Sequence, residues 1–190
     1  MGLTTTIERE IKLRYDSVES ARAAVLATGA TPLLGRRLQE DALLDTEDES
    51  LRRRRCVLRV RLENGNSRLT FKGPVQPSLM KMRDELETIV GDGVLLLRVF
   101  EELGFHVWFR YEKYREEFCH EEVIVAVDET PVGVFVEIEG SEPGITAMAT
   151  LLGRRPDDYI LDSYRGLFLQ WREATGITGA EMLFGSPEQA

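Results

Sequence analysis

The sequence predicts an α+β fold in which an antiparallel β-sheet curls into a barrel, with helices packed on its outer side. Three observations support this prediction. Many short segments alternate apolar and polar residues, which is the period of a β-strand. Amphipathic helical segments lie between them and can cover the apolar faces. The polar faces consist almost wholly of Arg, Lys and Glu, which favours a charged interior over the alternative, an open sheet with one wet side.

The expected strands follow from this alternation and from turn residues between them. Asn64-Gly65-Asn66 is a strong hairpin signal because such residues adopt the positive φ angles of tight turns. The polar stretch 45–55 is expected to be a loop. The predicted strands are residues 5–15, 38–45, 57–63, 68–72, 81–90, 107–118, 121–128 and 132–139.

Four segments have the apolar spacing of amphipathic helices, at residues 17–27, 92–103, 143–152 and 163–175. Ser17 can cap the first helix, and Gly29 fits just beyond its end. We expect residues 1–176 to form one domain. Residues 177–190 are expected to be a loosely ordered tail, because they show little periodicity.

Composition limits the class of protein. The chain has 190 residues, of which 43% are hydrophobic, and this is enough for one core. A net charge of −9 disfavours electrostatic binding to nucleic acid or to an anionic membrane. The sequence has neither an apolar run of membrane-spanning length nor the apolar core of a signal peptide near Met1, so we expect a cytoplasmic protein. Cys56 and Cys119 are too few for a disulfide framework and lack zinc-ligand partners at short spacing.

Charged side chains share one face of many predicted strands, because residues two apart in a strand point the same way. Glu8, Glu10 and Lys12 share a face, while Ile11 and Leu13 take the other. The same pattern gathers basic and acidic side chains from the other strands. They are Lys12, Arg59, Arg61, Lys72, Arg83 and Arg115, with Lys113 on the face of Arg115, and Glu8, Glu10, Glu85, Glu87, Asp128, Glu137 and Glu139.

An interior that holds both signs of charge needs a reason, since unpaired buried charges are costly. A polyanion bound together with divalent cations supplies one. Arg and Lys neutralise phosphate oxygens, and paired carboxylates hold Mg²⁺ or Mn²⁺. The two sets on neighbouring strands therefore indicate metal-assisted phosphoryl chemistry.

These residues also resemble a known family. The segment 8–12, Glu-Arg-Glu-Ile-Lys, is similar to the E-x-E-x-K signature of the CYTH superfamily, the triphosphate tunnel metalloenzymes. Further blocks follow in the family's order over about residues 5–171. They are Leu58-Arg59-Val60-Arg61, Leu69-Thr70-Phe71-Lys72-Gly73-Pro74, Arg83-Asp84-Glu85-Leu86-Glu87, Lys113-Tyr114-Arg115, Asp128-Glu129-Thr130-Pro131, Gly133-Val134-Phe135-Val136-Glu137-Ile138-Glu139 and Ser163-Tyr164.

The resemblance implies a closed antiparallel barrel of about eight strands that forms a tunnel, dependence on Mg²⁺ or Mn²⁺, and a substrate that carries a triphosphate. Two features depart from the family's pattern. Leu43 and Leu44 stand where many members have an aromatic pair. The four arginines at 52–55 stand where an ordinary turn is expected; we interpret them as a solvated loop, with a substrate-gathering mouth as the alternative.

The leading hypothesis that the resemblance supports is a metal-dependent triphosphatase, acting on inorganic tripolyphosphate or on an organic triphosphate such as thiamine triphosphate. Glu10 and Lys12 are the candidate catalytic residues, with Lys12 as a base whose pKa neighbouring cations would lower, or as an ordinary phosphate contact. The candidate triphosphate ligands are Lys12, Arg59, Arg61, Lys72, Arg83, Lys113 and Arg115. The candidate metal ligands are Glu8, Glu10, Glu85, Glu87, Asp128, Glu137 and Glu139.

Two other functions stay open. A class IV adenylyl cyclase would convert ATP to cyclic AMP and pyrophosphate, and it would need a pocket for the base. Trp108, Phe109 and Tyr111 are candidates for that pocket, although they also fit core or rim packing. A non-catalytic polyphosphate-binding module would need only the basic set. In each case the expected partner is a small-molecule triphosphate, with no nucleic acid or membrane, and the chain is either a monomer or a homodimer.

Overall fold

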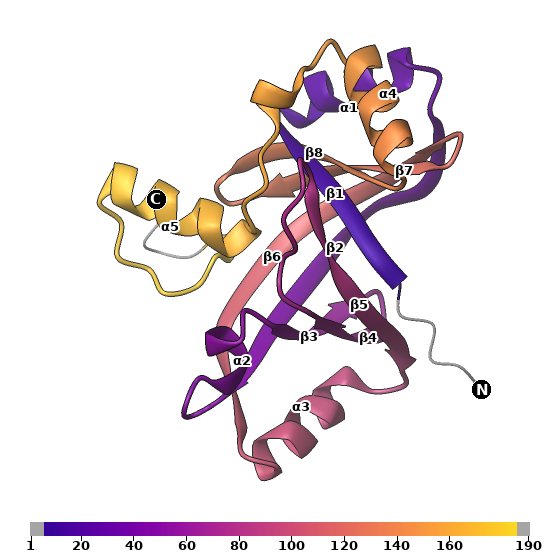
Figure 1. Ribbon diagram of the computed structural model, residues 1–190. Coiled ribbons are helices and arrows are strands. Elements are labelled where there is room, and N and C mark those ends of the chain that lie inside the picture. The colour runs from indigo at the N-terminus through magenta and orange to yellow at the C-terminus, as the bar shows by residue number, and fades with distance from the viewer. Residues whose placement is uncertain (1–5, 186–190) are drawn as a thin grey trace, which may run out of the picture.

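The computed structural model describes residues 6–185 and shows a closed barrel of eight antiparallel strands (Figure 1). The strands are β1 (Thr6–Tyr15), β2 (Thr31–Thr46), β3 (Val57–Glu63), β4 (Asn66–Lys72), β5 (Lys81–Val90), β6 (Phe105–His120), β7 (Val123–Thr130) and β8 (Gly133–Glu139). Their order around the barrel is β1-β5-β4-β3-β2-β6-β7-β8. The barrel that the sequence predicts is therefore confirmed.

The first strand closes the barrel. β1 pairs with β5 on one side, where Glu8 lies opposite Arg83. On its other side it pairs with β8, where Lys12 lies opposite Glu137. Charged residues that are far apart in the sequence are therefore neighbours on the inner surface of the barrel.

Two helices cover the outer face of the barrel, as the sequence predicts. These are α1 (Val18–Ala27) and α4 (Glu142–Leu151), which lie together over β1, β7 and β8 (Figure 1). Ser17 caps α1 through its side chain. The helices pack on apolar residues that alternate with the charged ones. This core includes Ile11, Leu13, Val25, Phe118, Val125, Val136, Ile138, Ile145 and Met148.

The last helix, α5 (Tyr164–Thr175), packs differently from the helices outside the barrel. Its first residue, Tyr164, is buried in one cluster with Phe109, Tyr111 and Phe135. Phe109 and Tyr111 lie on the same face of β6 as Lys113, and Phe135 lies on the same face of β8 as Glu137, because each is an even number of residues away. All three therefore occupy inner-face positions. The side chain of Tyr164, at the start of α5, therefore lies in the lumen. The sequence predicts only helices that pack outside the barrel.

Several boundaries differ from the prediction. β2 begins at Thr31 rather than Leu38, and register shifts interrupt its pairing with β6. Such bulges break the strict alternation that marks a strand in the sequence. A short helix, α2 (Ser50–Arg53), lies within the expected loop. In the expected tail, Met182 is fully buried against the barrel, whereas residues 186–190 lie outside the described part of the chain.

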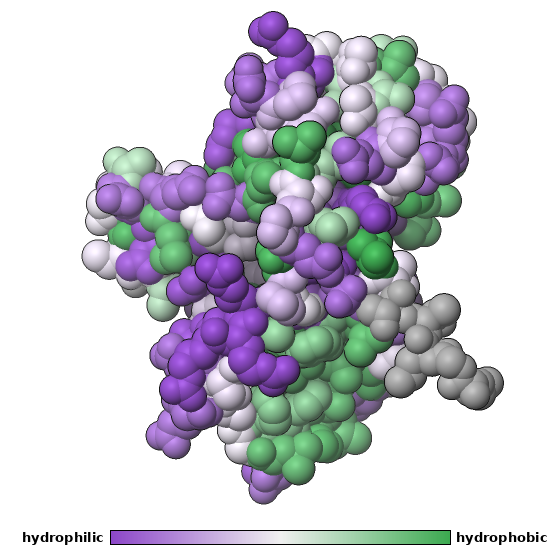
Figure 2. Space-filling view, in the orientation of Figure 1, coloured by the Kyte–Doolittle hydropathy of each residue, from purple (hydrophilic) through white to green (hydrophobic). Residues whose placement is uncertain are grey.

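One side of the surface is markedly apolar. Figure 2 shows this surface over α3 (Gly93–Glu102) and the strands beside it. Its exposed side chains are Leu86, Ile89, Val94, Leu95, Val99 and Leu103. Of the helices in residues 6–185, none has the length and apolar character that crossing a membrane requires.

Asp45 organises the connection between β2 and β3. This carboxylate is fully buried and accepts hydrogen bonds from the backbone N–H groups of Thr46, Leu51 and Arg52, at 2.8, 2.9 and 3.0 Å. It also pairs with the Arg52 guanidinium at 3.1 Å. The loop that carries the four arginines is therefore fixed to the barrel by one buried acceptor.

We expect Asp45→Ala to lower the free energy of unfolding by about 3 kcal/mol, because several buried donors lose a charged acceptor. Equilibrium unfolding in urea, followed by circular dichroism, measures this change. The matched control is Asp48→Ala, which removes an exposed ion pair with Arg53 and an exposed hydrogen bond from the Thr46 hydroxyl and should cost about 1 kcal/mol. Equal losses in the two variants would contradict the role given to Asp45.

Candidate functional site

The barrel encloses a charged cavity of about 590 Å³, lined by residues from all eight strands. Most of its lining side chains are Glu, Lys or Arg. The alternation seen in the sequence explains this, since every second residue of each strand points inward. The structure brings nearly all the predicted site residues to this cavity, and Asp128 lies buried directly behind its wall.

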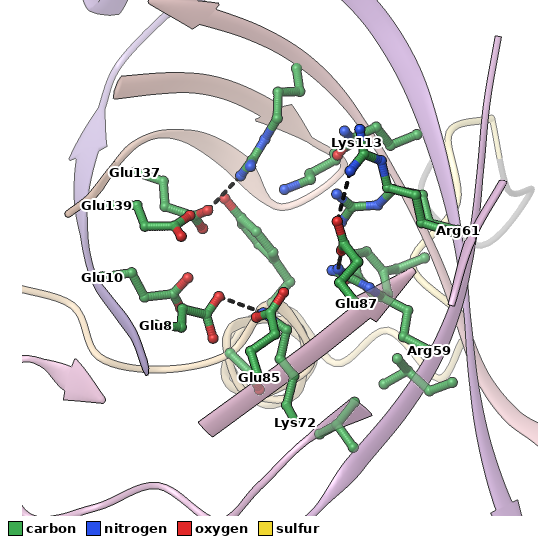
Figure 3. A pocket seen from close by; sticks show the side chains of 18 of the residues that line it. Glu8, Glu10, Arg59, Arg61, Lys72, Glu85, Glu87, Lys113, Glu137 and Glu139 are labelled. Carbon is green, nitrogen blue, oxygen red and sulfur yellow. Dashed lines mark hydrogen bonds and ion pairs between the residues drawn. The ribbon is translucent and has the colours of Figure 1, made fainter. Parts of the chain in front are cut away.

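The charges are segregated across the lumen. Figure 3 shows Glu8, Glu10, Glu137 and Glu139 together on one side, on β1 and β8. Arg59, Arg61 and Lys113, from β3 and β6, lie on the opposite side. We call these the acidic wall (Glu8, Glu10, Glu137, Glu139) and the basic wall (Arg59, Arg61, Lys113 and Arg115). The two walls meet at one point, where Arg115 pairs with Glu137 at 2.6 Å.

Buried lysines neutralise part of the acidic wall. Glu10 accepts hydrogen bonds from Lys12 at 2.7 Å and from Lys81. Burial alone would raise the pKa of Glu10, but Lys12 and Lys81 hold it well below the usual range despite the nearby Glu137. Burial also lowers the pKa of Lys81 to about 8, with the positive charge of Lys12 adding to the effect.

The expectation that cations crowd Lys12 and lower its pKa is wrong. Burial acts in that direction, but Glu10 and Glu137 outweigh it and raise the pKa of Lys12. The Lys12 ammonium lies between the two carboxylates, 3.1 Å from Glu137. Lys12 is therefore a protonated cation that neutralises part of the acidic wall.

Asp41 orients the arginines of the basic wall. Its carboxylate accepts two hydrogen bonds from Arg61, at 2.8 and 3.1 Å, and lies 3.5 Å from Arg59. Arg59 also donates to Thr70 at 3.1 Å. Since a guanidinium has five N–H donors, each arginine keeps donors that can bind an anion in the lumen.

Asp128 plays the same role for the rest of the basic wall. It accepts two hydrogen bonds from Arg115, at 2.7 and 2.6 Å, and one from Lys113 at 2.8 Å. The hydroxyl of Tyr164 also donates to it. Burial lowers the pKa of Lys113 to about 8, and Arg115 reinforces this shift. Asp128 is thus occupied in positioning cations, although the sequence placed it among the metal ligands.

The other predicted residues pair with one wall or the other. Lys72 bridges Glu8 and Glu85, and it lies 2.6 Å from the latter. Arg83 contacts Glu8 at 3.2 Å. Glu87 accepts from Arg68 at 2.7 Å and from Thr70 at 2.9 Å, so it belongs to the basic side.

Glu139 is the acidic-wall carboxylate that no lysine or arginine of residues 6–185 pairs with. Its side chain is accessible to solvent at the cavity, and it has no ion pair among residues 6–185. Desolvation within the barrel raises the pKa of Glu139 to about 7, together with repulsion from Glu8, Glu137 and Glu10. A cation bound at this wall would relieve that repulsion.

The carboxylates do not form a ready-made metal site. Within residues 6–185, no three Asp, Glu, His or Cys side chains are arranged to hold an ion. Part of the reason is visible in the contacts above, because lysine and arginine donors occupy both oxygens of Glu8 and Glu137 and one oxygen of Glu10.

Sequence reasoning missed three residues of the site. Lys81 shares a strand face with Arg83, so the alternation could have found it at the start of β5. Asp41 lies in a predicted strand between Gln39 and Leu43 on the inner face. These uncharged neighbours hide the run of alternating charges that marks the other strands. Tyr164 was noted only as part of the Ser-Tyr pair, since nothing in a helix indicates that its first residue enters a barrel.

The aromatic candidates for a base pocket are occupied by protein contacts. Tyr111 is buried and stacks on Phe109, with ring centroids 5.9 Å apart. The guanidinium groups of Arg52 and Arg165 both lie over the Trp108 ring, 4.4 and 4.7 Å from its centre. Arg52 and Arg55 line the cavity, so part of the arginine run belongs to its mouth rather than to a solvated loop.

Comparison of solved structures supports the fold. A "putative adenylate cyclase" from Vibrio parahaemolyticus has a TM-score of 0.75 at 18% identity, over 87% of this chain and 99% of that one. The PH1012 protein of Pyrococcus horikoshii gives 0.71 at 25% identity, over 84% and 98%. HpAC1 from Hippeastrum, a "putative adenylyl cyclase" described with a dominant triphosphatase activity, gives 0.62 at 19% identity, over 88% and 95%.

Sequence comparison identifies the family of the chain. A protein of Methanocaldococcus jannaschii named "Putative adenylate cyclase" is 30% identical over 136 residues, which make up 71% of this chain and 77% of that protein. The family model of the CYTH domain matches residues 6–152, which include every strand of the barrel. With the charged lumen described above, these matches show that the chain belongs to the CYTH family.

Proposed function

We propose that this protein is a divalent-metal-dependent hydrolase that holds a triphosphate in the lumen and cleaves a phosphoanhydride bond. The observation that carries the proposal is the opposition of the acidic wall and the basic wall across one enclosed cavity. A phosphate chain coordinated to divalent cations has the complementary charge arrangement, with anionic oxygens on one side and cations on the other.

The basic wall would bind the phosphates. Arg59, Arg61 and Arg115 are buried, and Asp41 and Asp128 fix their orientation. Arginines that are already in place lose little freedom when they bind, so more of their electrostatic energy is available to stabilise the charge that develops in phosphoryl transfer. Lys72 and Lys113 would add further positive charge from β4 and β6.

The acidic wall has the donor chemistry for a hard cation. Glu8, Glu10, Glu137 and Glu139 would hold Mg²⁺ or Mn²⁺, an ion that neutralises phosphate oxygens and lowers the pKa of bound water. The raised pKa of Glu139 supports this assignment, since it reflects, after burial, the repulsion of the neighbouring carboxylates Glu8, Glu137 and Glu10. Lys12 keeps Glu10 and Glu137 ionised and close together.

The aromatic residues that the sequence offers as a base pocket do not support cyclisation of ATP. A cyclase must also bind the nucleobase, yet Trp108, Phe109 and Tyr111 are engaged in packing and in contacts with arginine. The relatives carry adenylate cyclase names, and the Hippeastrum protein of the same fold is described with a dominant triphosphatase activity. The names alone therefore do not favour the cyclase.

Product analysis tests the proposal. The protein is supplied in parallel with tripolyphosphate, thiamine triphosphate and ATP, each with Mg²⁺ or Mn²⁺. We expect orthophosphate from at least one triphosphate and none without metal. Cyclic AMP and pyrophosphate from ATP as the main products would establish the cyclase instead. Binding of a triphosphate with no turnover under either metal would indicate a binding module.

We expect Glu10→Gln to lower turnover at least about 100-fold, because it removes a metal-binding charge and leaves Lys12 and Lys81 without their shared partner. Steady-state release of phosphate measures the effect, and circular dichroism checks that the variant is folded. Glu102→Gln, an exposed substitution on α3, is the matched control and should retain activity. Full activity of a folded Glu10→Gln protein would remove this carboxylate from the metal site.

A second prediction concerns pH. Since the pKa of Glu139 is raised from 4.5 to about 7, the folded state keeps a proton that the unfolded state loses, and the protein loses stability as pH rises through this range. In the presence of a metal chelator, Glu139→Gln should therefore raise the free energy of unfolding more at pH 8 than at pH 5. Urea unfolding at both pH values measures it, and Mn²⁺ should stabilise the wild type more than the variant. An identical gain at both pH values would refute the assignment.

A further inference from the structure

One group of charges remains outside the proposed chemistry. Arg52, Arg55 and Arg165 line the same cavity as the basic wall, and Arg52 and Arg165 lie over the ring of Trp108, which also lines it. We call these four residues the arginine mouth. Resting on the proposed function, we propose that the arginine mouth is a second anion site, which binds the part of a linear inorganic polyphosphate that extends beyond three phosphates in the lumen.

The arginine mouth continues the basic wall. Val57, Arg59 and Arg61 are alternate residues on the inner face of β3, and Arg55 comes two residues before Val57. All four line the cavity. A phosphate chain held by Arg59 and Arg61 can therefore meet further positive charge at the end of the same strand, without leaving the cavity.

Two of these arginines form no direct ion pair in the described part of the chain, although the charge of Glu49 acts on Arg165 and opposes the fall of its pKa. Among residues 6–185, neither Arg55 nor Arg165 forms an ion pair or a side-chain hydrogen bond. Partial burial and the nearby Arg52 lower the pKa of Arg165. Like charges held close together destabilise one another unless an anion neutralises them, and arginine is suited to phosphate.

The arginine mouth is also held in place. Arg52 pairs with buried Asp45 at 3.1 Å and with Glu49 at 2.9 Å. Arg55 has a left-handed backbone, with φ of 58°, and the peptide N–H of Cys56 bonds to Leu51 at 2.9 Å. These contacts fix the turn that presents the guanidinium groups, as expected of a preorganised site. Figure 2 shows the hydrophilic side chains gathered over α2.

The opposite end of the barrel has different chemistry. Antiparallel pairing places the end of β8 at Glu139 beside Ile124, and this end also receives the start of β2 with Leu33 and Leu34. These exposed apolar side chains line the cavity there. An organic group would find apolar contacts at that end, whereas the arginine mouth offers mainly positive charge. A longer chain of phosphates is therefore the ligand that fits the mouth.

Binding by isothermal titration calorimetry in chelator tests the proposal independently of turnover. The ligands are tripolyphosphate and a size-fractionated linear polyphosphate of greater length. The test variant is Arg55→Gln/Arg165→Gln. The matched control is Arg53→Gln/Arg54→Gln, which removes the same charge from exposed residues of the same run that do not line the cavity.

We expect the test variant to raise the Kd of the longer chain at least about tenfold and that of tripolyphosphate less than about twofold, with little change in the control. Equal weakening for both ligands would overturn the proposal, as would equal weakening by the control variant or no change for the longer chain. Binding of both anions without hydrolysis in the metal-containing assay would overturn the proposed function alone. If neither anion bound to the wild type, both would be overturned.

Discussion

Pairing of opposite charges inside the closed barrel is the interaction on which the rest of this structure depends. Burying a lone ammonium or carboxylate is prohibitively costly, so each must meet a partner as the strands close. Lys12 does so between Glu10 and Glu137, which come from β1 and β8. The barrel geometry and the charge pattern are therefore mutually dependent, because only closure makes these carboxylates and the lysine neighbours.

The acidic residues fall into two groups by what they contact. Asp41 and Asp128 are enclosed by arginine and lysine donors and hold them in fixed orientations. Glu139 is compensated least, and its raised pKa records this. Aspartates with shorter side chains thus serve the basic wall, while glutamates on β1 and β8 leave negative charge facing the cavity. The proposed binding of a phosphate chain together with cations rests on this division.

The sequence predicts most of the inner surface, because the alternation of Glu8, Glu10 and Lys12 with apolar residues favours a curled sheet over an open one. Closure of about eight strands into a tunnel is what the family resemblance implies. The sequence does not predict the order of the strands, since β1 pairs with β5 and β8 rather than with its neighbour β2. It also misjudges Lys12, whose pKa is raised by Glu10 on the same strand face and by Glu137 from β8. Asp41 was missed because the register shifts of β2 and its mixed inner face obscure the pattern.

The position of β1 between β5 and β8 also bears on how the chain folds. The strand that leaves the ribosome first cannot complete its pairing until the last strand of the barrel has been made. Such a topology has a high contact order, which is associated with slow folding. Until then, a half-formed sheet exposes both unpaired strand edges and uncompensated charges, so premature termination before β8 should yield a chain that chaperones and proteases readily engage.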